Sequence, residues 1–87
     1  MILHTFNSIE AWQQYADLLT PEDVALFLED GVLATCRQDM TLHDRSVALA
    51  TDLAARGLTE RCRVQALTDS DFVELCVEAS KVVSWHR

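Results

Sequence analysis

Three cysteine thiols are the side chains in this sequence best suited to covalent chemistry. Cys62 lies between Arg61 and Arg63, and two neighbouring cations stabilise the thiolate, the nucleophilic form of cysteine. Arginines also commonly flank a residue that enters a strand, so we expect a structural role for Cys62 and keep sulfur chemistry as the alternative.

The other two cysteines fall on apolar positions of predicted helices. Cys36 is in register with Leu33, which favours packing in the core. It also follows the Asp30-Gly31 turn closely, and a helix N-terminus there would stabilise a thiolate. Cys76 lies on the apolar stripe of the last predicted helix, where we expect a buried structural thiol. An odd number of cysteines without paired spacing fits a reducing cytoplasm better than a disulfide scaffold.

The histidines predict no metal site. His4, His43 and His86 show no ligand spacing with the cysteines or with one another. Two glycines are too few for a phosphate-cradling loop, and no nucleophile elbow of the GxSxG type is present, so no cofactor is expected. His4, placed near the end of the first predicted strand, is the best polar candidate for a site, with a hydrogen-bonded edge histidine as the alternative.

The segment from 24 to 32, VALFLEDGV, is expected to position these side chains. A short apolar run without a solvated face is typical of a strand covered on both sides, as in parallel sheets. Asp30 and Gly31 then predict a sharp turn, because glycine tolerates positive φ and aspartate bonds nearby backbone. This turn lies at the carboxyl end of a buried strand, where open α/β sheets usually place their sites.

Strand and helix patterns alternate along the rest of the chain. This alternation predicts one α/β domain over residues 1–87, with a mostly parallel four- to five-stranded sheet flanked by helices. Strands are predicted at 2–6, 24–28, 46–50, 63–68 and 82–85, and helices at 8–19, after Gly31, at 52–57 and from Asp69 or Ser70 onward.

Two details of the helices follow from their residues. Asn7 and Glu10 resemble a capping box at the start of the first helix. The last helix is expected to bury one apolar face, comprising Phe72, Val73, Cys76, Val77 and Ala79 or Ser80.

Composition and charge narrow the function classes. The chain has 87 residues, 49% of them apolar, and 14 acidic against 7 basic residues give a net charge of −7. A chain of this sign is repelled by phosphate backbones, so we expect no direct nucleic-acid binding. No segment has the length of a membrane span, and the first residues do not resemble a signal peptide. We therefore expect a cytoplasmic protein.

Several segments together resemble the TusB/DsrH family of sulfur-relay proteins. They are ILHTF at the start, VALFLEDGV, VALATDLAARGL, TDSDFVELCVE and the terminal Trp85, and they follow one another in the family's order at near-family spacing. The resemblance covers almost the whole chain. It implies a small α/β fold and a role as a non-catalytic subunit, in a hetero-oligomer with TusC/DsrF-like and TusD/DsrE-like subunits.

The resemblance also implies a pathway. In the Tus branch the complex passes persulfide sulfur toward 2-thiolation of the wobble uridine of certain tRNAs, and in the Dsr branch it serves sulfur oxidation. DsrH proteins of sulfur oxidisers carry a cysteine in the first helix, sixteen positions before the glycine of the DG turn, and this chain has Tyr15 there. Tyr15 therefore favours the tRNA branch. The main sulfur-carrying cysteine of the family belongs to the TusD/DsrE-type subunit.

Two hypotheses stay open. The first is a non-catalytic assembly subunit, for which Trp12, Trp85 and Phe72 would be natural interface anchors or else core residues. The second is a stand-alone or DsrH-like persulfide carrier that uses Cys62 or Cys36. A generic ligand-binding module is a third possibility, which predicts a pocket near Asp30 and His4.

Overall fold

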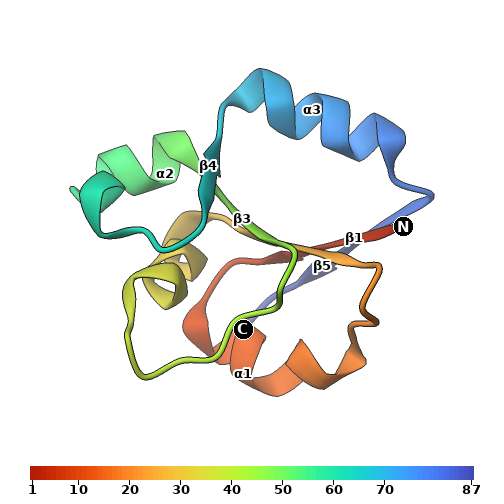
Figure 1. Ribbon diagram of the computed structural model, residues 1–87, viewed down its shortest axis with the longest axis horizontal. Helices are drawn as coiled ribbons and strands as arrows, with labels where there is room; N and C mark the ends of the chain where they lie inside the picture. Colours follow the sequence, from red (N-terminus) through yellow and green to blue (C-terminus); the bar gives the residue numbers. More distant parts are fainter.

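Five parallel strands form one open sheet in the computed structural model, which describes every residue from Met1 to Arg87. The order across the sheet is β4-β3-β2-β1-β5 (Figure 1). The strands are β1 (Ile2–Phe6), β2 (Val24–Phe27), β3 (Ser46–Leu49), β4 (Gln65–Leu67) and β5 (Lys81–Trp85). The predicted α/β class is confirmed, and each predicted strand is present with ends shifted by at most two residues.

The connections between strands are short helices. The α-helices are α1 (Ile9–Tyr15), α2 (Ala50–Ala55) and α3 (Asp69–Glu78), and the 3-10 helices are η1 (Ala16–Leu18), η2 (Glu29–Cys36) and η3 (Thr59–Arg61). None of them has the length and apolar character that a membrane span requires.

The caps of two helices differ from those predicted. Ser8, not Asn7, caps α1, because its Oγ accepts a hydrogen bond from the N–H of Ala11 at 3.1 Å. Thr68 caps α3 in the same way by accepting from the N–H of Asp71. The cap of α1 lies one residue after the predicted Asn7, and the cap of α3 lies before both Asp69 and Ser70, at either of which the sequence pattern allowed the helix to begin.

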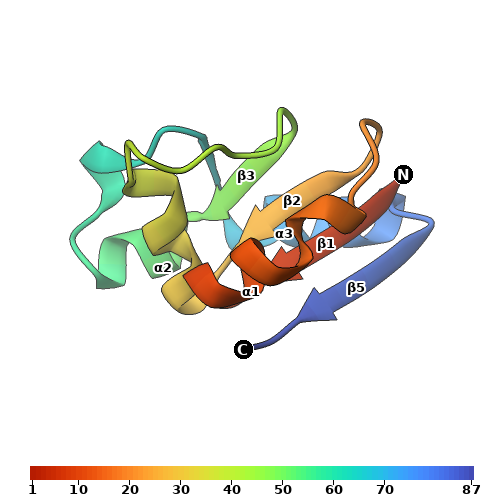
Figure 2. The ribbon, with the colours of Figure 1, turned by 90° about the horizontal axis from the view of Figure 1, so that it is seen from below.

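The chain path explains which helices cover which face. From β1 to β4 each connection steps in one direction across the sheet, and the last one returns to β5 at the opposite edge. Because crossovers between parallel strands are right-handed, the returning helix α3 must lie on the other face from α1, η2 and α2. Figure 2 shows α3 behind the strands and α1 in front of them, and Figure 1 shows α1 and α3 at opposite sides of the molecule.

The larger core lies on the face covered by α1, η2 and α2. Its centre is aromatic, since the Trp12 ring meets Phe6 and Phe27 edge-on, with centroid distances of 5.1 and 5.4 Å. Trp12 is only 6% exposed, so in this chain it belongs to the core and is not available as a surface anchor. Leu53 of α2 and Val32 of η2 complete the cluster.

The smaller core lies beneath α3. It consists of Leu3, Val24, Leu26 and Leu67, against which α3 packs Phe72, Leu75, Cys76 and Ala79. The predicted face of α3 is therefore wrong in part, because Val73 and Val77 are 61% and 80% exposed. The helix is rotated so that Leu75 faces the sheet in their place.

Candidate functional site

The carboxyl ends of β1, β2 and β5 meet at the point where the strand order reverses. Beside them is a shallow pocket of about 310 Å³ between the start of α1, the start of η2 and the end of the chain. It is lined by Asn7, Ser8, Ile9, Glu10, Glu29, Asp30, Leu33 and Arg87. Open α/β sheets usually bind ligands at this position, so a functional site is expected here.

Asn7 ties the end of the chain to this pocket. Its Nδ2 donates to His86 Nδ1 at 3.2 Å, and its Oδ1 accepts from the backbone N–H of Arg87 at 3.3 Å. Asn7 thus holds the residues after β5 beside the end of β1. Sequence reasoning assigned Asn7 to a helix cap, and nothing in the sequence indicated this contact between residues 79 positions apart.

The turn after β2 is built differently from the predicted one. Gly31 lies inside η2 and does not supply a positive φ, which is found instead at Glu29, with φ of 51°. Gly31 is required for space, since a Cβ there would lie 2.0 Å from the carbonyl oxygen of Phe6. The Glu29 N–H donates to Asp52 Oδ2 at 2.6 Å, which helps to hold the unusual backbone.

The Asp30 carboxylate has a structural role, because it is held in an ion pair. Its Oδ1 forms an ion pair with the Arg56 guanidinium at 2.9 Å, and Arg56 also lies 3.9 Å from Asp52. These exposed pairs join the start of η2 to α2, and surface pairs of this kind contribute up to about 1 kcal/mol each. Asp30 lies at the predicted edge of the sheet, but its carboxylate is already engaged.

His4 lies in the middle of β1 and faces a different part of the molecule. Its Nε2 is 3.0 Å from Asp23 Oδ2, and the Trp85 indole N–H donates to its Nδ1 at 3.0 Å. Because indole nitrogen can only donate, Nδ1 is the acceptor and Nε2 carries the proton that is donated to Asp23. His4 is buried, and it does not meet Asp30, so the predicted pocket joining the two is absent.

Asp23 was missed by sequence reasoning, yet it organises the amino end of the sheet. It is 4% exposed, and its carboxylate accepts from the N–H of Ile2, the N–H of Thr20 and His4 Nε2. Burial raises the pKa of Asp23, but these hydrogen bonds, led by that from Thr20, outweigh burial and lower the pKa to about 2. An acidic residue directly before a buried strand was the only signal available.

The histidines are each engaged separately. His43 Nε2 donates to the backbone carbonyl of Asp23 at 2.7 Å, while His4 bonds the Asp23 side chain and His86 bonds Asn7. No group of three or more His, Cys, Asp or Glu side chains is arranged to hold a metal ion.

Comparison with known proteins identifies the family. A family model described as "DsrH like protein" matches residues 7–82. The chain belongs to the DsrH-like family. DsrH-like proteins are sulfur-relay subunits that work in complexes with other such subunits. No curated protein matches the sequence.

The fold of this DsrH-like chain is similar to that of a solved structure described as "Crystal structure of ychN protein from E.coli". The TM-score is 0.65 at 11% sequence identity, and the match covers 95% of this chain and 96% of that one. At this identity the likeness concerns the fold alone, and it agrees with the sheet and helices described above.

Tyr15 is the residue that the resemblance to DsrH proteins placed at the position of a first-helix cysteine. Its ring stacks on Trp85, with the centroids 4.3 Å apart and the planes 21° from parallel. Trp85 in turn donates its indole N–H to His4, with the two ring planes 5° from parallel, so the three rings connect α1, β5 and β1. Trp85 is half-buried, and this part of the DsrH-like fold is an aromatic contact without a thiol.

The three cysteines of this DsrH-like chain are half-buried and unpaired. Cys36 ends η2, so it lies at the C-terminal end of that helix and not near an N-terminus that would stabilise a thiolate. Its Sγ lies 3.6 Å from the carbonyl oxygen of Val32, to which it can donate. The argument for a reactive Cys36 therefore loses its physical basis.

Cys62 and Cys76 also make structural contacts. Cys62 Sγ donates to the Val64 carbonyl at 3.2 Å and packs against the larger core. Arg63 does not turn toward the thiol, since its guanidinium donates to the Met40 carbonyl at 2.9 Å. Cys76 packs from α3 against the smaller core, but it is half-buried and not fully buried as predicted.

Proposed function

We propose that this DsrH-like chain is a non-catalytic subunit of a sulfur-relay complex that supports persulfide transfer for 2-thiolation of the tRNA wobble uridine. Its partners are TusC/DsrF-like and TusD/DsrE-like subunits, and the cysteine that carries sulfur belongs to the TusD/DsrE-like partner. The complex acts in the cytoplasm, and the tRNA is contacted by the partners, because this chain carries a net charge of −7.

The family match over residues 7–82 is the observation that carries the sulfur-relay role. The tRNA branch is supported by the resemblance, in which Tyr15 takes the place of the cysteine expected of DsrH proteins from sulfur oxidisers. The engaged polar groups of the carboxyl edge support it, since Asp30 is paired with Arg56 and Asn7 with His86. An assembly role requires surfaces and no reacting group at this edge.

The competing function is a persulfide carrier that uses Cys62. The observation in its favour is a half-exposed thiol between Arg61 and Arg63. A carrier requires a thiol that forms a persulfide in the isolated chain, whereas an assembly subunit requires none.

Native mass spectrometry of the tagged chain, purified from its own source cells, separates these functions. We expect two other small proteins in equal stoichiometry, and we expect Cys36→Ser/Cys62→Ser/Cys76→Ser to retain sulfur transfer to tRNA in the assembled complex. Cys76→Ser alone serves as the control for damage to packing. A complex that assembles normally but loses transfer in Cys62→Ser would refute the assembly role and establish the carrier.

A further inference from the structure

The face of the sheet beneath α3 is covered by a single helix, and it leaves a groove open. The groove has a volume of about 420 Å³ and lies between α3 and the first residues of β2, β3 and β4. Its floor is apolar, comprising Val24, Val47, Leu67 and Leu75. A volume of this size is within the range of about 300–1,000 Å³ typical of ligand clefts.

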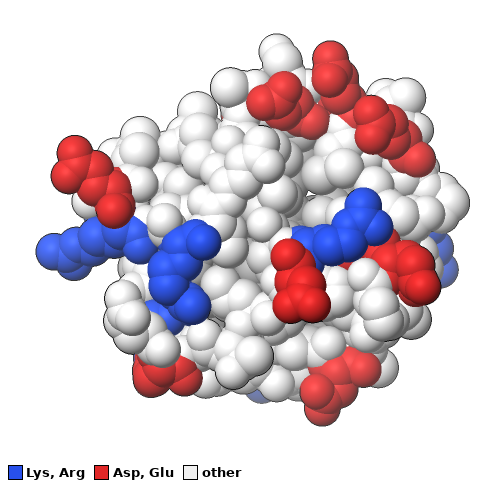
Figure 3. Space-filling model, viewed as in Figure 1, with Lys and Arg blue, Asp and Glu red and all other residues white.

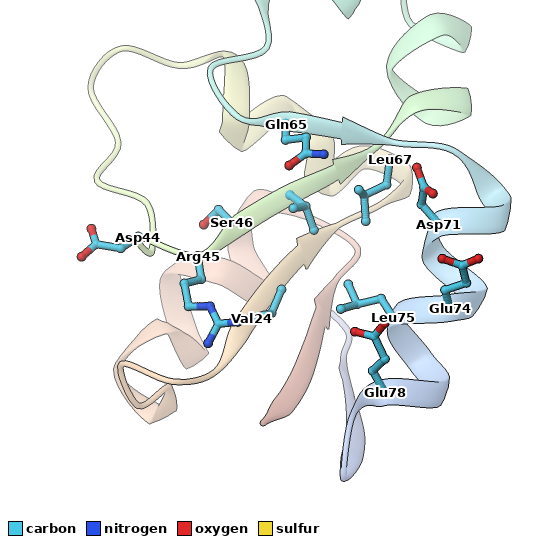
Figure 4. A pocket seen from close by; sticks show the side chains of 11 residues that line it. Val24, Asp44, Arg45, Ser46, Gln65, Leu67, Asp71, Glu74, Leu75 and Glu78 are labelled. Atoms are coloured by element: carbon cyan, nitrogen blue, oxygen red, sulfur yellow. The ribbon is translucent and has the colours of Figure 1, made fainter.

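The rim of this groove is strongly acidic. Asp71, Glu74 and Glu78 follow one another at helical spacing along α3, and Asp44 lies on the opposite rim (Figure 4). In Figure 3 acidic side chains gather over α3 at the upper right, without a basic side chain among them. The three carboxylates of α3 thus line one side of the groove, whereas the Asp44 side chain points away from it in Figure 4.

None of these four carboxylates forms an ion pair within the chain. The ion pairs present are His4–Asp23, Arg37–Asp39, Arg56–Asp30 and Arg56–Asp52. Arg45 is the only basic residue that lines the groove, and its guanidinium donates to the Glu22 carbonyl at 2.8 Å. The groove therefore combines an apolar floor with a rim that keeps a net negative charge, because four carboxylates and one arginine line it.

We propose that this groove docks a basic segment of a partner protein, with an aliphatic lysine or arginine stem on Val24, Val47 and Leu75 and its cation among Asp71, Glu74 and Glu78. Long basic side chains bury their stems on apolar surface while keeping the charge at the rim, which matches this arrangement. A second copy of the chain does not fit, because each copy carries a net charge of −7. The inference rests on the proposed function, since the segment belongs to a sulfur-relay partner.

The test compares charge reversal in the groove with the same reversal elsewhere. Glu74→Lys/Glu78→Lys changes two exposed positions of α3, and Asp17→Lys/Glu60→Lys makes the same change in net charge at exposed positions outside the groove. Each tagged full-length chain is expressed in the source cells, and its helical content is checked by circular dichroism. We expect the groove variant to retain at least tenfold less of the co-purified partners than wild type at fixed salt, and the control to retain them.

A carbodiimide, which joins carboxylates to amines in direct contact, identifies the occupant. We expect mass spectrometry of the treated wild-type complex to show Glu74 or Glu78 joined to a partner lysine. If the groove variant alone loses its partners but no such link forms in the wild type, the contact is assigned to a partner arginine. Equal retention by both variants would overturn the inference while leaving the proposed function intact. A link to Lys81, the only lysine of this chain, in a species with the mass of two copies would overturn it in favour of self-association. A wild-type chain that captures no partner would refute the proposed function and this inference together.

Discussion

Replacing Asp23 by asparagine tests the hydrogen-bond network at the amino end of the sheet. Asp23 Oδ1 accepts from Ile2 N–H at 3.3 Å, and Oδ2 accepts from Thr20 N–H at 3.1 Å and from His4 Nε2 at 3.0 Å. Asparagine has one side-chain oxygen, so keeping the two shorter bonds turns its NH₂ toward the N–H of Ile2. One hydrogen bond is lost, and the other two lose the negative charge of their acceptor.

The expected loss in free energy of unfolding at pH 7 is about 1–3 kcal/mol, because hydrogen bonds to a charged group are worth about 1.5–3 kcal/mol each. Urea denaturation measures it, since a slope of roughly 1 kcal/mol/M for a chain of this size makes the midpoint fall by about 1–3 M. Asp17→Asn is the control, because Asp17 is an exposed carboxylate outside this network.

The same variant predicts a pH dependence. The pKa of Asp23 is lowered from 3.8 to about 2 in the folded chain, so its contribution is complete above 3.8 and is lost as the pH falls toward 2. The shift corresponds to about 2 kcal/mol, and roughly half of it is lost by about pH 3. The stability difference between wild type and Asp23→Asn must shrink over this interval. An equal difference at pH 6 and pH 3 would refute the reasoning.

Three further substitutions test single contacts, each by thermal or urea unfolding. Trp85→Phe removes the indole N–H donated to His4 while keeping an aromatic ring, so we expect a loss of about 1–2 kcal/mol and faster amide exchange in β5; unchanged exchange there would contradict the role of this bond. Gly31→Ala places a Cβ 2.0 Å from the Phe6 carbonyl oxygen, and we expect a loss of about 2–3 kcal/mol, whereas a neutral effect would show that η2 shifts freely. Val77→Ser changes a residue that is 80% exposed, and we expect the free energy of unfolding to change by no more than about 0.5 kcal/mol. A larger loss would show that Val77 is packed in the core.

The sequence was sufficient for the fold class because apolar runs and turn residues alternate clearly. The strand at Val24–Phe27 has no solvated side, and Thr20-Pro21 ends the preceding helix, so both features are local. The buried face of α3 was predicted only in part. Phe72, Val73, Cys76 and Val77 form a helical stripe, but so do Phe72, Leu75, Cys76 and Ala79, and only the path of α3 back across the sheet selects the second.

The polar contacts were beyond sequence reasoning for a different reason. The pairing of His4 with Asp23 depends on the register of β1 and β2, in which Leu3 lies beside Val24 and His4 beside Ala25. A long crossover joins two parallel strands, so no tight turn sets their register, and β2 is buried at every position, so its pattern does not set it either. The prediction that Asp30 and Gly31 lie at the carboxyl edge of the sheet depended only on their position after β2, and this position is correct. The geometry of the turn itself differs from the one predicted.

The polar groups that have partners within the chain, and those that do not, favour a role in protein contacts over a role in catalysis. At the amino end of β1 and β2 every buried polar atom has a partner, and at the carboxyl edge Asp30 and Asn7 are bonded. Along α3, by contrast, three carboxylates without intramolecular partners, Asp71, Glu74 and Glu78, lie on the same helix as two exposed valines. Unpaired charge beside exposed apolar surface contributes little to the stability of an isolated domain, but both gain free energy when a complementary protein covers them. The arrangement is thus the one expected of a subunit that completes its interactions in a complex.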